Sequence, residues 1–198
     1  MTLIFASNNP HKLEEVRAVL GPDFDILSLD SLGHRTEVPE TQDTLRGNAL
    51  QKARYIFDKF GRDCFADDTG LEIESLGGQP GVFTARFAGV GCTPAQNREK
   101  TLRLLTGIEH RTATFRTVIA LILGGREYLF EGRVAGSITT TETGEGGFGY
   151  DPIFQPSGCN QTYAEMDLDT KSRLSHRALA ASQLKAFLKK LRSPEATQ

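Results

Sequence analysis

Two acidic side chains stand next to each other directly after a short apolar run, in the segment Phe65–Gly70. Such a run is typical of a buried strand, and α/β proteins bind ligands at the ends of strands. One carboxylate of such a pair can hold Mg²⁺ while the other orients or deprotonates a water molecule. Asp67 and Asp68 are therefore candidates for a hydrolytic site, with an ordinary acidic turn as an equally good explanation.

A strand-to-helix turn near the N-terminus is a candidate anion site. Asn or Ser before Pro10 can cap a helix, and proline suits its first turn. Free backbone N–H groups and the positive end of the helix dipole favour phosphate, and Lys12 adds a charge one turn into the helix. A plain helix cap beside a solvated lysine is the alternative, and the chain has no Walker-type phosphate loop.

Glycines and aromatic side chains alternate in the segment Gly144–Pro152. Glycine lets the backbone approach a ligand closely, and an aromatic face can stack on a nucleobase. Asp151 or main-chain groups could then bind the edge of that base. A flexible hairpin loop is the alternative, although Phe148 and Tyr150 are unusual residues for one.

Cations gather before and at the start of the last predicted helix. Lys171 and Arg173 precede Ser175, a plausible helix cap, and His176 and Arg177 follow it. Cations in a first helical turn oppose the helix dipole, so their placement costs stability unless an anion is bound. The segment therefore indicates an anion site.

These segments require a scaffold of strands and helices. Strands are predicted over Leu3–Ala6, Asp25–Leu29, Cys64–Ala66, Leu71–Glu74, Thr112–Leu123 and Glu127–Ile138, with a polar break at Asp67–Gly70. Helices are predicted over Pro10–Leu20, Asp43–Phe60, Thr93–Leu105 and Ser175–Leu191. Gly124 to Arg126 form the turn of a hairpin. The order indicates an α/β protein with a mixed sheet and two lobes flanking a cleft.

The composition excludes several classes of protein. The 198 residues include 23 Lys+Arg and 25 Asp+Glu, and this slightly negative balance argues against a nucleic-acid binder. No apolar run reaches the roughly 18 residues that span a bilayer, and the N-terminus does not resemble a signal peptide. The 3 cysteines lie far apart, which argues against a disulfide framework or a structural zinc site. We expect a soluble cytoplasmic protein with a frayed tail over residues 193–198.

Together, the motifs resemble those of the inosine triphosphatase (Ham1-like) family, which hydrolyses nucleoside triphosphates that carry deaminated purines. The similarity extends from Ile4 to about Leu191, in the order of the family. Its motifs are Ala6–Lys12 with Glu14–Glu15, Glu40–Thr41, Asn48–Ala49, Lys52–Ala53, Ala66–Leu71, Gly77–Gly89, Gly146–Phe154, Thr162–Met166, Lys171 and Ser175–Ala178.

The resemblance implies a single inosine triphosphatase-like domain over residues 1–198, with an elongated mixed sheet, flanking helices and two lobes around a central cleft. It implies a homodimer and Mg²⁺-dependent conversion of dITP, ITP and XTP to the monophosphate and pyrophosphate, which removes such purines from the nucleotide pool. Neither nucleic acid nor membrane is an expected partner. A Maf-like pyrophosphatase of modified nucleotides and a non-catalytic nucleotide-binding module are the alternatives.

The resemblance also assigns roles to individual residues. Asp68 would act as general base and, with Glu40, would coordinate Mg²⁺, with Asp67 beside them as support. The triphosphate would be held by Ser7, Asn8, Asn9, Pro10, His11 and Lys12, with Lys52 as a second cation. Singly, Glu40 and Lys52 are more typical of surface residues.

The nucleoside has its own set of expected contacts. These are Phe148, which would stack on the purine, and Gly149, Tyr150, Asp151, Lys171, His176 and Arg177. Thr69 stands where the family often has serine, and its hydroxyl preserves binding there. Selectivity would come from Lys171, His176 and Arg177 as donors to the 6-oxo group of ITP and XTP, because the 6-amino group of ATP would face them donor to donor.

Overall fold

A computed structural model describes residues 1–192, which divide into two compact units. Unit 1 contains residues 1–68, 117–132 and 175–192, and unit 2 contains residues 69–116 and 133–174. Three long strands contribute residues to both units: β3 (Cys64–Ile73), β5 (Thr112–Leu123) and β6 (Arg126–Ile138). The predicted frayed tail lies outside the described residues.

The sheet is mixed, as the sequence predicted. Its strand order is β2-β1-β3-β5-β6-β7, and β4 (Pro80–Gly81) pairs with β3. Strand β1 (Thr2–Phe5) runs parallel to β2 (Asp25–Ser28) and to β3. Strand β4 is antiparallel to β3, and β7 (Phe154–Pro156) is antiparallel to β6. The α/β fold class is therefore confirmed.

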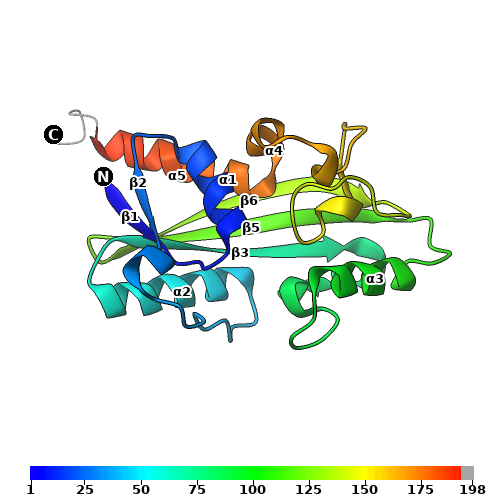
Figure 1. Ribbon diagram of the computed structural model, residues 1–198, viewed down its shortest axis with the longest axis horizontal. Coiled ribbons are helices and arrows are strands. Elements are labelled where there is room, and N and C mark those ends of the chain that lie inside the picture. The colour runs from blue at the N-terminus through cyan, green and yellow to red at the C-terminus, as the bar shows by residue number, and fades with distance from the viewer. Residues whose placement is uncertain (193–198) are drawn as a thin grey trace. The chain divides into compact units, whose positions relative to one another are not determined.

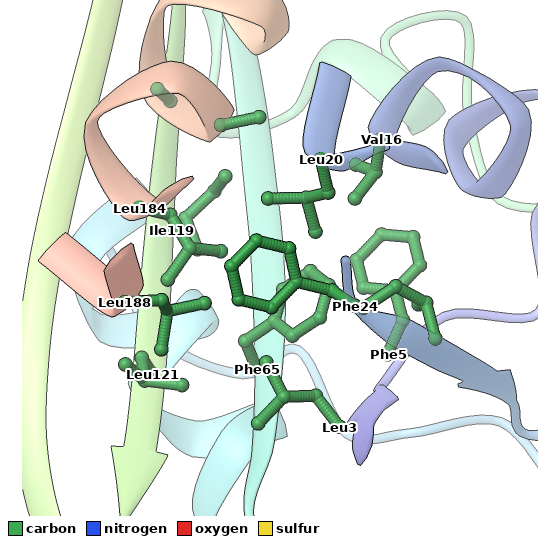
Figure 2. Packing of buried hydrophobic residues seen from close by; sticks show 13 residues of the cluster. Leu3, Phe5, Val16, Leu20, Phe24, Phe65, Ile119, Leu121, Leu184 and Leu188 are labelled. Carbon is green, nitrogen blue, oxygen red and sulfur yellow. The ribbon is translucent and has the colours of Figure 1, made fainter. Parts of the chain in front are cut away.

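Unit 1 has helices on both faces of its strands. Helices α1 (Pro10–Leu20) and α5 (His176–Arg192) cover one face, and α2 (Leu45–Phe60) covers the other (Figure 1). On the α1 and α5 side, Phe5 and Phe65 stack with ring centroids 4.9 Å apart, among the leucines of both helices (Figure 2). On the other side, the Cys64 thiol donates to the Ala53 carbonyl of α2. Successive residues of β3 thus face different helices.

Unit 2 has a hydrophobic core of its own. The rings of Phe115, Phe154 and Tyr163 form its centre, with Phe115 and Phe154 centroids 4.6 Å apart. Its helices are α3 (Pro94–Leu104) and α4 (Leu168–Leu174), with short 3₁₀ helices at 74–76, 84–86, 151–153 and 163–165; unit 1 has one at 30–32. Tyr150 and Ile153 also belong to this core, so the core holds the chain on both sides of Asp151, where the glycine-rich loop ends.

The ends of the helices and the hairpin follow the sequence signals. The side chains of Asn9, Thr44 and Thr93 cap α1, α2 and α3. Gly61 ends α2 with a φ of 61°, in the left-handed region where glycine is free of strain. Gly124 and Gly125 also have positive φ, as a two-residue hairpin between β5 and β6 requires. The caps of α1 and α3, the end of α2 and the hairpin are thus confirmed. The Thr44 cap was not predicted, and α2 begins at Leu45, not at the predicted Asp43.

Some details of the predicted elements were wrong, and the short strands β4 and β7 were not predicted. Strand β3 has no polar break, because it continues through Asp67–Gly70 to Ile73. Pairing with β1 near Cys64 and with β4 at Leu71 outweighs the low strand propensity of aspartate and glycine. The short helix α4 before Ser175 was not predicted, since seven residues are too few for a clear helical period. Within residues 1–192, none of the helices combines the length and apolarity needed to cross a membrane.

Gly132 lets β6 pass close to the first turn of α5. A Cβ at this position would lie 2.6 Å from the backbone nitrogen of Ala180 and would also meet the His176 carbonyl oxygen. We expect Gly132→Ala to lower the free energy of unfolding by about 1–3 kcal/mol, because neither backbone group can move aside easily. Urea denaturation measures this change. Arg126→Ala, at an exposed position of β6, serves as the control, and an equal effect of both variants would contradict the prediction.

Candidate active site

The two adjacent aspartates of β3 belong to different ionic groups in unit 1. Because successive strand residues point to opposite faces, Asp67 faces α1 and α5 while Asp68 faces α2. Asp67 accepts hydrogen bonds from Lys12 Nζ at 2.9 Å and from Arg177 Nε at 3.0 Å. Asp68 accepts one from Asn48 Nδ2 at 3.1 Å. Asp67 therefore shares no hydrogen-bond partner with Asp68, although its charge also acts on Lys52.

Arg177 forms the centre of the first group. Its guanidinium is buried and contacts Glu15 Oε2 at 2.5 Å as well as Asp67. Burial lowers the pKa of Arg177, but Asp67 and Glu15 outweigh burial and raise it. For the Asp67 carboxylate, burial acts in the opposite direction and raises the pKa. The charges of Lys12 and Arg177 outweigh burial and hold the pKa of Asp67 well below its usual range. The anion expected at the start of the last helix is thus supplied by the chain's own carboxylates.

Lys52 joins the members of the second group. Its Nζ lies 2.5 Å from Glu40 Oε1 and 3.5 Å from Asp68 Oδ1. Burial raises the pKa of Asp68, and repulsion by Glu40 adds to this effect against the opposing attraction of Lys52. Burial lowers the pKa of Lys52, but Asp68 and Glu40 outweigh it and raise the pKa, so the ammonium stays charged. Two predicted metal ligands and a predicted phosphate-binding cation therefore lie together.

The N-terminal turn is capped more completely than the sequence indicated. The Asn9 side-chain oxygen accepts the backbone N–H groups of His11 at 3.0 Å and Lys12 at 3.3 Å. Ser7 Oγ accepts the N–H of Asn9 at 3.2 Å, and Pro10 has no N–H. Asn8 donates its side-chain amide to the Thr36 carbonyl. The anion site expected at this turn would therefore depend on Lys12, whose pKa is lowered by burial, more than on free backbone groups.

The predicted nucleoside residues form a separate group in unit 2. The Asp151 carboxylate accepts the backbone N–H of Phe148 at 2.7 Å and the Lys171 ammonium at 2.6 Å. Lys171 Nζ also lies 4.8 Å from the centroid of the Phe148 ring. A Cβ on Gly147 would lie 2.9 Å from Asp151 Cγ, so this turn needs glycine. An aromatic face, a carboxylate and an ammonium group are thereby held together.

Not every predicted contact lies in one of these three groups. Tyr150 is buried in the core of unit 2, where its hydroxyl donates to the Thr84 carbonyl at 3.0 Å. The His11 side chain is exposed, and Thr69 is half-buried on β3. Arg177 and buried His176 belong to unit 1, whereas Lys171 belongs to unit 2. Gly149 is engaged through its backbone oxygen, which accepts a hydrogen bond from Arg98 at 2.8 Å.

Three contributors to these groups had no assigned role. Glu15 lies three residues after Lys12 on α1, and Asn48 lies four residues before Lys52 on α2, so each shares a helix face with a predicted site residue. That spacing was a usable signal. Arg98 on α3 binds the glycine-rich loop through Gly149 and lies 2.9 Å from Glu142, and no motif announced it.

The acidic residues suit a hard cation. Among residues 1–192, no set of three or more His, Cys, Asp and Glu side chains is placed to hold a metal by itself. Mg²⁺ is usually bound by one or two carboxylates together with water and substrate phosphates, and Glu40 and Asp68 supply such a pair. An oxygen of each carboxylate already lies near the same cation, the Lys52 ammonium. The two carboxylates are therefore close enough to each other to bind one metal ion together.

The chain is similar to known proteins over nearly its whole length. A model of the Ham1 family matches residues 3–187. The dITP/XTP pyrophosphatase of Porphyromonas gingivalis is 51% identical over 187 residues, which cover 94% of this chain and 96% of that relative. The dITP/XTP pyrophosphatase of Flavobacterium johnsoniae is 47% identical, with 93% and 96% covered. The solved Ham1 protein of Staphylococcus aureus matches with a TM-score of 0.86 and 34% identity, over 96% of this chain and 100% of its own.

Removing the Arg177 guanidinium takes a shared cation from two buried carboxylates, Glu15 and Asp67, of which Asp67 keeps Lys12. We expect Arg177→Met to lower the free energy of unfolding by about 3–5 kcal/mol. Adding Glu15→Gln to this variant restores part of the loss, because it removes one buried negative charge. Urea denaturation of the single and double variants measures both effects. Arg173→Met, which removes an exposed ion pair with Asp169, is the control; a double variant less stable than Arg177→Met would refute the explanation.

Proposed function

Because the chain belongs to the Ham1 family, we propose that it hydrolyses dITP, ITP and XTP to the monophosphate and pyrophosphate. The family resemblance that the motifs indicated is confirmed, and the names of the relatives support the activity. The Maf-like and non-catalytic alternatives gain no support. The observation that carries the proposal is the convergence of Glu40 and Asp68 on the Lys52 ammonium.

The charges of unit 1 favour a metal-bound polyphosphate. The two ionic groups contain three cations, Lys12, Lys52 and Arg177, and four carboxylates, Glu15, Glu40, Asp67 and Asp68. A polyphosphate would add further negative charge, so its binding requires another cation. Glu40 and Asp68 would hold Mg²⁺, which when bound neutralises phosphate charge and polarises a phosphoryl oxygen.

The reaction requires a water molecule to attack the α-phosphorus while the bond from that phosphorus to the bridging oxygen breaks. Asp68 would accept the proton of the water. Lys12 and Lys52 would stabilise negative charge on the phosphates and on the leaving pyrophosphate. Arg177 would act through Asp67, which it holds ionised against Lys12.

The residues of unit 2 suit recognition of the purine. Phe148 would stack on the base, and Lys171, a donor-only group, would face the 6-oxo oxygen. The 6-amino group of ATP would place donor against donor at this position. The guanidinium of Arg177 is engaged by Glu15 and Asp67, as the ammonium of Lys171 is by Asp151. The homodimer rests on the family resemblance, and the single-domain description and the cytoplasmic location rest on the resemblance together with the length and composition of the sequence.

The proposed activity is tested by measuring pyrophosphate release from ITP, XTP, GTP, ATP and dUTP. We expect rapid release from ITP and XTP, with IMP and XMP as the other products, and no release after removal of Mg²⁺ with a chelator. Preferred release from dUTP would favour a Maf-like enzyme. Binding of nucleotide without any release would favour a non-catalytic module.

Asp68 as the proton acceptor leads to a second prediction. We expect Asp68→Asn to lower kcat by at least about 10²-fold, because the amide cannot take the proton. Binding of a non-hydrolysable ITP analogue, measured by calorimetry, stays within a few-fold of the wild-type value. Asp58→Asn, an exposed position on α2, is the matched control. Near wild-type turnover of Asp68→Asn would exclude this role.

Lys171 as the base-recognition donor predicts a change in selectivity. We expect Lys171→Ala to reduce the ratio of kcat/KM for ITP over ATP by about 10-fold or more, since a missing donor no longer penalises the 6-amino group. The ratio is measured from pyrophosphate release with each nucleotide. Lys100→Ala, on α3, provides a control lysine of unit 2 that donates to the Phe87 carbonyl. An unchanged ratio in Lys171→Ala would assign selectivity elsewhere.

A further inference from the structure

Asn48 is a buried polar residue on α2 that binds two parts of the second ionic group. Its side chain is 0% exposed. The side-chain Nδ2 donates to Asp68 Oδ2 at 3.1 Å, and the side-chain Oδ1 accepts the backbone N–H of Gln42 at 2.9 Å. Gln42 lies two residues after Glu40, so one amide group contacts one predicted metal ligand and the loop that carries the other.

An amide satisfies both contacts at once. The Gln42 N–H can only donate, and the ionised Asp68 carboxylate can only accept, so the group between them must offer an acceptor on one side and a donor on the other. This requirement fixes the orientation of the Asn48 amide. A leucine of similar volume would remove both hydrogen bonds, and an aspartate would set two carboxylates against each other.

Helix α2 holds both oxygens of Asp68. Asn48 binds Oδ2, and Lys52, four residues later on the same helix face, lies 3.5 Å from Oδ1. The plane of the carboxylate is thereby fixed from two points on one rigid element. Lys52 also reaches Glu40, so each of these two α2 residues connects Asp68 with the Glu40 loop.

The loop itself is packed tightly against α2. A Cβ on Gly47 would lie 2.7 Å from Gln42 Cβ, so the loop occupies space that only glycine leaves open. Gln51 holds the same loop at Thr41, where its Oε1 accepts the backbone N–H at 2.9 Å and its Nε2 donates to the hydroxyl at 2.8 Å. Asn48 and Gln51 therefore bind neighbouring residues of the loop, Gln42 and Thr41. The two differ in that Asn48 also donates a hydrogen bond to Asp68.

We propose that Asn48 is a positioning residue, which fixes the positions of the Asp68 and Glu40 carboxylates relative to each other so that both can bind one divalent cation. It acts on Asp68 directly and on Glu40 through the backbone of Gln42. The inference rests on the proposed function for the identity of the cation, and on the two hydrogen bonds for the role of the residue. Residues that hydrogen-bond to metal ligands and orient them commonly contribute about 10–100-fold to metal affinity or activity. A change of this size in metal affinity is measurable by titration.

The test measures metal binding and turnover separately. The full-length protein without nucleotide is titrated with Mn²⁺, which shares the preference of Mg²⁺ for oxygen ligands, and free Mn²⁺ is followed by electron paramagnetic resonance. We expect Asn48→Ala to weaken Mn²⁺ binding about 10–100-fold and to lower kcat with Mg²⁺ by a similar factor. KM for ITP stays within about threefold of wild type, because Lys12 and the residues of unit 2 are unaltered.

Gln51→Ala is the matched control, because it releases the same loop at Thr41 without removing a partner of Asp68. We expect its Mn²⁺ affinity to stay within about threefold of the wild-type value. Gly47→Ala tests the loop by itself: its Cβ would lie 2.7 Å from Gln42 Cβ and would displace the loop, so we expect Mn²⁺ affinity to fall. Circular dichroism and urea denaturation verify folding, and Asn48→Leu replaces Asn48→Ala if the latter does not fold.

Equal Mn²⁺ affinities of the Asn48 and Gln51 variants would overturn the proposal, as would a loss confined to KM. Failure of the proposed function has a different signature. A wild-type protein that releases no pyrophosphate from any nucleotide would contradict that function, whereas the nucleotide-free Mn²⁺ titrations would still decide the role of Asn48.

Discussion

The burial of ionised carboxylates along β3 is the constraint on which the arrangement of unit 1 depends. Taking a carboxylate out of water costs several kcal/mol, and the cost is offset only when cations and hydrogen-bond donors surround it. Asp67 and Asp68 are both almost fully buried, and they are adjacent in sequence. Each must therefore have its own set of partners, one on either face of the strand.

Three helices supply these partners. Helix α1 contributes Lys12, α5 contributes Arg177, and α2 contributes Asn48 and Lys52. The apolar sides of α1 and α5 pack against the Phe5 and Phe65 side of the strands, so the packing that stabilises unit 1 also delivers charged groups to Asp67. A site built in this way is rigid before any ligand binds, which suits electrostatic stabilisation of a phosphoryl transition state.

Unit 2 also contains a buried ion pair, and this pair shapes a loop. The Asp151–Lys171 pair is buried, and it holds the backbone of Phe148 and places a cation near its ring. Arg98 fastens the glycine-rich loop from outside. The loop thus owes its shape to ionic and hydrogen-bonded contacts more than to the flexibility that four glycines in six residues would otherwise confer.

The sequence by itself determined the mixed α/β class, nearly every helix, the hairpin and the family, because these follow from local periodicity, caps and motifs that stand in order along the chain. It also identified Asp68, Glu40, Lys52 and Lys171 as residues of interest. Only the tertiary structure decided that Asp67 and Asp68 serve different groups, since this follows from β3 continuing as a strand through a segment whose residues favour a turn. Tertiary structure likewise turned the Arg177 guanidinium toward Glu15, 162 positions away in sequence. Pairing of charges across such separations depends on which helix faces meet, and local sequence carries no record of that.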